Sequence, residues 1–230
     1  MNSAPQDKHL KAFTTLLANE QIDPDLEEIA LVLCQVLDIE CQESLFREEL
    51  DLLANTVVDR TPEGLIAVLF RSGLLAGDRV QYDHPHNSLP HKALSSGRGL
   101  PITLCILALL VSRRCNIELW GVGLPGHFVV GAKTENGTEF FDPFNGGIRL
   151  SRDQCIAIAS ITGVITDSEG LFRPISTRSI VIRILNNLTQ SYRRRSDWVG
   201  LRAVVSLRLA VPELRKTDLN ATLALVRELN

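Results

Sequence analysis

The chain has 230 residues, enough to bury a substantial core in one large domain or in a core with a helical annex. With 45% hydrophobic and 22% charged residues, its composition is that of an ordinary globular protein. The net charge of −3 gives no electrostatic case for binding nucleic acid or an anionic membrane.

The chain shows no sequence signal for a membrane. Its longest apolar run, 102–111, is about ten residues long, whereas a membrane span needs about 20. The first residues, MNSAPQDKHLK, lack the apolar core of a signal peptide. We therefore expect a cytoplasmic protein with no membrane or nucleic-acid partner.

The cysteines indicate reduced, buried thiols rather than a disulfide framework. Their number is odd, no CxxC motif occurs, and most of them lie in apolar surroundings. The same features argue against zinc. The five are Cys34, Cys41, Cys105, Cys115 and Cys155.

Three histidines, His84, His86 and His91, fall within eight residues. Only Asp83 adds a further potential ligand, so we expect a surface loop stiffened by prolines rather than a metal site. No cofactor is expected.

The N-terminal third of the chain predicts helices. Asp23 is expected to cap the first of them, with Pro24 at its first position, and a break is expected between Cys34 and Cys41. A second helix is expected over about 43–58. A third is expected to begin at Thr61-Pro62-Glu63 and to end near 71–77.

The middle of the chain predicts an irregular segment, then an apolar helix and then an antiparallel sheet. Residues 81–99, QYDHPHNSLPHKALSSGRG, are expected to be mostly irregular, and an apolar helix is expected from Pro101 to about Arg114. Three segments then predict an antiparallel sheet: IELWGVGL, GHFVVGAK and TEFFDPF. Asn145-Gly146-Gly147 is expected to close the sheet, and Ser151 to cap a helix that runs through Cys155.

Helical patterns return from Ser176. RSIVIRILNNLTQSYRRR predicts a long amphipathic helix, and DWVGLRAVVSLRLAV with TDLNATLALVREL predicts an antiparallel helix pair across Pro212. We therefore expect an N-terminal helical part (1–76), a helix-plus-sheet core (77–170) and C-terminal helices (171–230), together in one compact unit.

A thiol near the start of the helix at 101–114, together with His127 and Asp142, suggests cysteine chemistry. Such chemistry needs a thiolate, a base that also acts as an acid, and a group that orients the base. A helix start lowers a thiol pKa through its dipole and free N–H groups. The chain order of thiol, helix, histidine and aspartate is that of papain-like and transglutaminase-like proteins.

Several motifs support this comparison. They are Tyr82, Pro85 and Asn87-Ser88 before the helix, RGLPITL (98–104), GVGLPGHFVV (121–130) and FDPFNGG (141–147). Together they resemble the transglutaminase-like superfamily, and most of all its small bacterial branch of SirB-type proteins. The resemblance implies an α+β fold with a cysteine-proteinase-like core, in which a central helix packs on an antiparallel sheet. It also implies that His127 and Asp142 occupy the His and Asp positions of a catalytic triad.

The nucleophile does not carry over, because the superfamily's catalytic cysteine falls on Pro101. Cys105 is four residues further along, on the same helix face and about 6 Å along the axis. Asn136-Gly137 would favour a two-residue hairpin, which would leave His127 about 13 Å from Asp142 along the strands. We therefore expect a longer loop of about four to six residues, which would let the two side chains meet.

These observations favour a transglutaminase-like domain with an incomplete Cys-His-Asp triad that binds a protein or peptide and has little or no acyl-transfer activity. The alternative is a cysteine-dependent protease, amidase or acyltransferase with Cys105 as nucleophile, His127 as base and acid, and Asp142 as the orienting group. A third possibility is an adaptor whose C-terminal helices dock a partner, with the core as a scaffold.

Overall fold

The computed structural model describes residues 4–135, 137–163, 167, 169–217 and 224. The chain divides into two compact units, each assembled from segments that are distant in sequence. The helical unit comprises the described residues of 1–46, 83–91 and 176–230, and the sheet unit comprises those of 47–82 and 92–175. The three-part division of the sequence stays a prediction.

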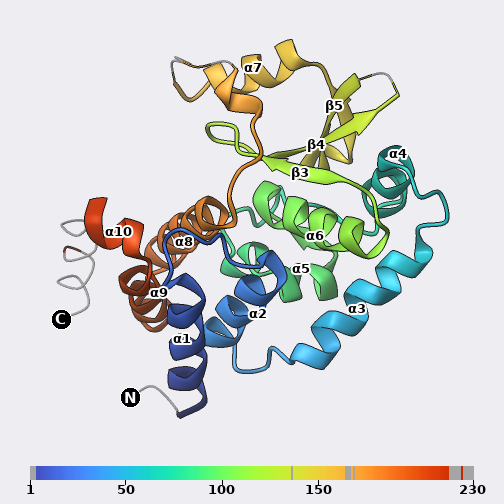
Figure 1. Ribbon diagram of the computed structural model, residues 1–230. Coiled ribbons are helices and arrows are strands. Elements are labelled where there is room, and N and C mark those ends of the chain that lie inside the picture. The colour runs from blue at the N-terminus through green and yellow to red at the C-terminus, as the bar shows by residue number, and fades with distance from the viewer. Residues whose placement is uncertain (1–3, 136, 164–166, 168, 218–223, 225–230) are drawn as a thin grey trace. The chain divides into compact units, whose positions relative to one another are not determined.

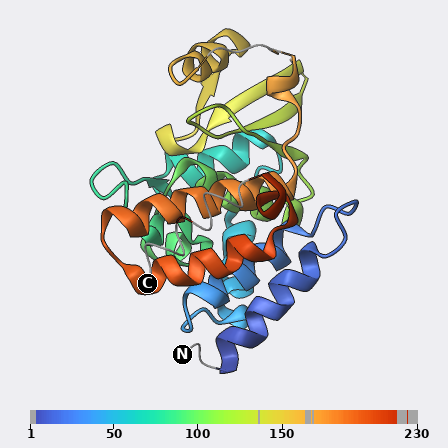
Figure 2. The same ribbon diagram turned by 90° about the vertical axis from the view of Figure 1, so that its left-hand side faces the viewer.

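The helical unit is built from α1 (Ala4–Leu17), α2 (Leu26–Leu37), α8 (Thr177–Arg194), α9 (Trp198–Ala210) and α10 (Pro212–Thr217). α1 packs against α2 and α9, and α8 packs against α9, as Figure 2 shows. α8 is the amphipathic helix that the sequence predicted: Ile180, Ile184 and Leu188 recur every four residues and are buried. A 3₁₀ turn, η2 (Pro85–Ser88), packs against α8.

The predicted cap of α2 is wrong by two residues. Asp25, not Asp23, is the N-cap, and its Oδ1 accepts hydrogen bonds from the N–H groups of Glu27 and Glu28. Asp23 instead accepts hydrogen bonds from the N–H groups of Thr177 and Arg178, at 2.7 and 3.0 Å. Both groups belong to the first turn of α8, where backbone N–H groups have no partner within the helix. Asp23 therefore stabilises a helix that begins more than 150 residues further along the chain.

The sheet unit contains a four-stranded antiparallel sheet. Its strands β3 (Leu119–Val122), β4 (Val129–Thr134), β5 (Gly137–Asp142) and β6 (Ile148–Leu150) pair in chain order. α6 (Pro101–Arg114) packs against β3 and β4, and α7 (Arg152–Ser160) lies on the opposite side of the sheet (Figure 1). The α+β architecture with a central helix packed on an antiparallel sheet is confirmed.

The sheet and α7 share one hydrophobic core. Side chains from β3, β4, β5 and β6 meet side chains from α7 and from η4 (Gly170–Phe172) in this core. α7 begins as predicted, because Ser151 and Gln154 form a capping box that satisfies two backbone N–H groups. The members of the core are Val122, Leu124, Val129, Phe140, Leu150, Cys155, Ala159 and Phe172.

The remaining elements precede the sheet. α3 (Glu43–Thr56) agrees with the predicted second helix, whereas the third becomes a short α4 (Pro62–Ile66) followed by a π-helical turn over Ala67–Arg71. Two short strands, β1 (Ala76–Gly77) and β2 (Arg98–Gly99), pair in parallel.

One of the remaining predictions is wrong, and another falls on residues that are not described. Residues 81–99 are not mostly irregular, because they hold η2, α5 (Pro90–Ser96) and β2. Pro90 suits the first turn of a helix, where its missing N–H is not needed, and Leu89 and Ala93 are buried. The last predicted helix, TDLNATLALVREL, lies almost entirely outside the described residues, and α10 begins at Pro212 before it.

No helix in the described part of the chain is long and apolar enough to cross a membrane.

Candidate functional site

His127 and Asp142 form a hydrogen-bonded pair in the sheet unit. Nε2 of His127 lies 2.8 Å from Oδ2 of Asp142. Asp142 is fully buried and the His127 side chain is 13% exposed, so one edge of the imidazole reaches solvent. The structure thus brings together two of the three candidate catalytic residues.

A tight turn positions His127. The His127 N–H donates to the Leu124 carbonyl at 3.1 Å across Pro125-Gly126. Gly126 has a φ of +69°, a backbone conformation that glycine adopts without strain. The turn delivers His127 just ahead of β4, beside the end of β5.

The expected four- to six-residue loop between β4 and β5 is wrong. The ladder continues to the pair Thr134–Gly137, so only two residues, 135 and 136, separate the strands. Asn136 itself lies outside the described residues. The register also differs by two residues from the one expected for an Asn-Gly turn. Extending the ladder by one step places Asp142 opposite Val129, only two residues from His127 and on the same face of the sheet.

Asn145 completes the environment of the Asp142 carboxylate. Its backbone N–H donates to Oδ1 at 3.2 Å and its side-chain amide donates to Oδ2 at 2.7 Å. Burial by itself would raise the pKa of Asp142, but the hydrogen bonds and charge of His127 and the hydrogen bonds of Asn145 outweigh burial and lower the pKa from its ordinary value. The carboxylate therefore stays ionised and holds the imidazole in place.

Sequence reasoning did not assign Asn145 a role at the site, although it quoted the FDPFNGG motif. The signal is the short spacing from Asp142 to Asn145: the chain turns through η3 (Pro143–Asn145), and Asp142 caps that turn.

An aromatic side chain borders the imidazole. The Phe144 ring meets the His127 ring edge to face, with ring centroids 6.3 Å apart. Tyr82 packs on Phe144 in the same geometry, and the Arg79 guanidinium lies over the Phe144 ring and bonds to Oδ1 of Asn145. Arg79 and Phe144 are further residues around the site that sequence reasoning missed.

The third candidate, Cys105, lies deep in α6. It is completely buried, and its thiol donates a hydrogen bond to the Phe128 carbonyl at 3.5 Å. Pro101 occupies the first turn of the helix, as predicted, with Leu100 as the N-cap residue. The helix start therefore presents a proline ring rather than a thiol.

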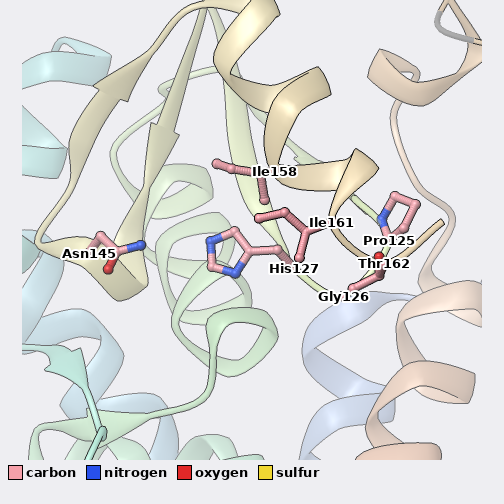
Figure 3. Close-up of a pocket in the computed structure, with 7 residues that line it drawn as sticks. All are labelled: Pro125, Gly126, His127, Asn145, Ile158, Ile161 and Thr162. Atoms are coloured by element: carbon pink, nitrogen blue, oxygen red, sulfur yellow. The ribbon is translucent and has the colours of Figure 1, made fainter. Parts of the chain in front are cut away.

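A pocket of about 220 Å³ opens beside His127. Figure 3 shows the imidazole between Asn145 on one side and Ile158 and Ile161 on the other. The pocket combines an apolar wall at the end of α7 with three polar side chains, those of His127, Asn145 and Thr162. Cys105 is not among its lining residues. The residues that line it are Pro125, Gly126, His127, Asn145, Ile158, Ile161 and Thr162.

The helical unit contains a second group of reactive side chains. His91 does not gather with His84 and His86: its ring lies close to Cys34 and Cys41, and their ligand atoms are within 4.8 Å of one another. Sequence reasoning missed this group, because the cysteine spacing matches no common zinc motif.

A helix packed on an antiparallel sheet, with a His–Asp pair at neighbouring strand ends, defines an α+β domain of the cysteine-proteinase-like kind. The chain belongs to the transglutaminase-like superfamily, whose family model matches residues 23–186. The match thus extends beyond the resemblance over 82–147 into the helices on both sides.

Relatives are found in bacteria and in an animal. The chain is 30% and 31% identical over 172 residues to the UPF0162 proteins of Xylella fastidiosa strains 9a5c and Temecula1 / ATCC 700964. Each match covers 70% of this chain, and the chain spans 61% of the length of these relatives. It is also 25% identical over 150 residues to F-box only protein 21 of Mus musculus, which covers 58% of this chain and 23% of that protein. No solved structure matches the chain.

Proposed function

We propose that this chain is a SirB-type transglutaminase-like protein with a degenerate triad, which acts as a binding or regulatory module for a protein or peptide and has little or no acyl-transfer activity. One observation carries the proposal: the His127–Asp142 pair borders a pocket whose lining includes no thiol. We also retain the expectation that the protein is cytoplasmic.

The chemistry of acyl transfer explains why this observation matters. The imidazole must take a proton from a nucleophile within hydrogen-bond reach, and the acyl group must reach the same nucleophile. Pro101 has no group that attacks a carbonyl. The Cys105 thiol bonds to a backbone carbonyl in the core, with no exposed surface.

The pocket suits an amino-acid side chain of a partner. Ile158 and Ile161 supply apolar contact area, whereas His127 and Asn145 supply polar groups that fix orientation. Ile161 is 82% exposed, so a bound peptide would also cover an apolar side chain at the rim. In this function Asp142 keeps the imidazole oriented without activating a nucleophile.

Two assays on the full chain test the proposal. The first offers casein as glutamine donor and a biotinylated primary amine as acceptor, and we expect no more incorporation than with a Cys105→Ser variant. The second probes an array of immobilised peptides. We expect His127→Ala to weaken binding of the selected peptides about tenfold, and His9→Ala, at a histidine on α1, to leave it unchanged. Amine incorporation that disappears in Cys105→Ser would overturn the proposal.

The alternative, a cysteine-dependent protease, amidase or acyltransferase that uses Cys105, His127 and Asp142, has one observation in its favour. The Cys105 thiol bonds to the carbonyl of Phe128, the residue that follows His127 in the chain. Activity would require the thiol to leave that carbonyl and reach the imidazole. The reactivity of the Cys105 thiol towards alkylating agents decides between the two functions.

A further inference from the structure

The end of α2 brings two cysteines together. Cys34 lies in the last turn of α2, and the helix ends at its C-cap, Asp38, whose N–H donates to the Cys34 carbonyl. The Cys41 N–H donates to the Asp38 carbonyl at 3.1 Å, and the Glu40 N–H donates to Oδ1 of Asp38 at 3.0 Å. These turn hydrogen bonds fold Cys41 back towards Cys34.

His91 joins the two thiols from a segment 50 residues further along the chain. One ligand atom each from Cys34, Cys41 and His91 lie within 4.8 Å of one another. Nε2 of His91 lies 2.8 Å from Oδ2 of Asp38. The other ring nitrogen, Nδ1, is buried and has no hydrogen-bond partner among the described residues.

We propose that Cys34, Cys41 and His91 bind a zinc ion, with Asp38 as the residue that orients His91. The site lies in the helical unit, whereas the pocket beside His127 lies in the sheet unit. The zinc proposal therefore does not depend on the function proposed above.

The ligand set and its support fit zinc. Two sulfurs and one imidazole nitrogen are ligands that zinc prefers, and histidine ligands usually donate their second ring N–H to a carboxylate. Asp38 supplies that carboxylate, which leaves Nδ1 of His91 with the lone pair that a metal needs. In a tetrahedral site the ligand atoms are roughly 3.4–3.8 Å apart. The ligand atoms of Cys34, Cys41 and His91 lie within 4.8 Å of one another, so they need to move only slightly closer together to bind the metal.

Burial and charge favour a metal over a cluster of free thiols. All three ligands are largely buried: Cys34 is fully buried, Cys41 is 7% exposed and the His91 side chain is 12% exposed. A buried thiolate is costly unless a positive charge compensates it, and a divalent cation would neutralise two thiolates at once.

The site has three protein ligands, and we assign the fourth position to a solvent molecule that approaches from the slightly exposed side of Cys41 and His91. Zinc would link the end of α2 to the start of α5 at His91, and both of these segments belong to the helical unit. We therefore expect the metal to stabilise the fold of this unit.

Metal titration of the full chain tests the proposal. The protein is reduced, stripped with a chelator and titrated with Co²⁺, which gives thiolate charge-transfer and visible bands in a tetrahedral sulfur site. We expect saturation at one Co²⁺ per chain, displacement by Zn²⁺, and a higher melting temperature with Zn²⁺ than without it. Absence of stoichiometric binding by the reduced protein would overturn the proposal, as would formation of a Cys34–Cys41 disulfide in air without any metal binding after reduction.

Variants assign the ligands. Cys41→Ser and His91→Gln are expected to abolish the charge-transfer bands, whereas Cys155→Ser, at a buried cysteine in the sheet unit, is expected to retain them. Asp38→Asn is expected to retain the bands but to weaken zinc binding about 10- to 100-fold. Far-UV circular dichroism confirms that each variant is folded before titration. Undiminished binding by folded Cys41→Ser or His91→Gln would contradict the assignment.

Discussion

Oδ2 of Asp142 lies 2.8 Å from Nε2 of His127 and 2.7 Å from the side-chain nitrogen of Asn145, while its partner oxygen Oδ1 accepts the Asn145 backbone N–H. A fully buried carboxylate thus receives three hydrogen bonds, which is why it remains charged inside the protein. The His127–Asp142 pair therefore helps to stabilise the sheet unit, and its histidine also lines the pocket.

Replacing Asp142 with Asn should destabilise the chain. The two carboxylate oxygens now accept hydrogen bonds from His127 and Asn145. In the variant an NH₂ group replaces one of these oxygens and faces a donor, so at least one buried hydrogen bond is lost. We expect the free energy of unfolding at pH 7 to fall by about 1–3 kcal/mol. Urea unfolding followed by circular dichroism measures the loss, and equal stability of the two proteins would contradict this account of the site.

The same variant reports the titration of Asp142. Because the folded-state pKa is lowered, the carboxylate contributes stability above its unfolded pKa of about 3.9 and loses that contribution as pH falls through the lower, folded value. The stability difference between wild type and Asp142→Asn should therefore shrink below about pH 4. A difference that stays constant from neutral to strongly acidic pH would show that the Asp142 pKa is not lowered.

Two adjacent glycines after the site offer a matched test of packing. Gly146 and Gly147 both have positive φ, 73° and 69°. A Cβ at Gly146 would meet nothing within 4 Å, whereas a Cβ at Gly147 would lie 2.5 Å from Cγ2 of the buried Ile66. Gly146→Ala should cost about 1 kcal/mol through backbone strain alone, and Gly147→Ala about 2–4 kcal/mol, because overpacking adds to the strain. Chemical unfolding measures both, and equal losses would show that the contact with Ile66 has no effect.

The reactivity of Cys105 separates the binding module from the enzyme. Because the thiol is completely buried and bonded to the Phe128 carbonyl, iodoacetamide should label it only as fast as the chain unfolds. Cys41, with a pKa of about 5 and some exposure, should react sooner in the metal-free protein. Peptide mapping by mass spectrometry gives both rates from one sample. Fast labelling of Cys105 at pH 6–7 that slows in His127→Ala would favour the enzyme.

Arg178 should be the most costly charged residue to replace in the helical unit. It is 7% exposed, pairs with Glu213 at 3.0 Å, and donates to the carbonyls of Leu17, Asn19 and Ile22. Arg178→Met leaves the Glu213 carboxylate and three carbonyls without these bonds, so we expect a loss of about 3–5 kcal/mol. The control, Arg195→Met at an exposed position, should change stability by no more than about 0.5 kcal/mol. Comparable losses in thermal unfolding would disprove the role assigned to Arg178.

The sequence alone determined the elements whose signals are local. α6 begins at Pro101 and ends at Arg114 as predicted, because a proline suits the first turn and a largely apolar run follows it over 102–111. Ser151 begins α7 for a similar reason, through a capping box completed within three residues. The family motifs around His127 and Asp142 also indicated the fold, although the turn that joins the two strands was predicted wrongly.

Only the tertiary structure decided which distant residues meet. The two-residue connection between β4 and β5 fixed a register that local turn propensity did not predict, and that register placed Asp142 beside His127. Asp23 binds the start of α8, and His91 lies beside Cys34 and Cys41, because packing brought together segments separated by 50 residues or more. Caps and periodicity act over a few residues, whereas burial of side chains selects among many long-range arrangements that satisfy the same local signals.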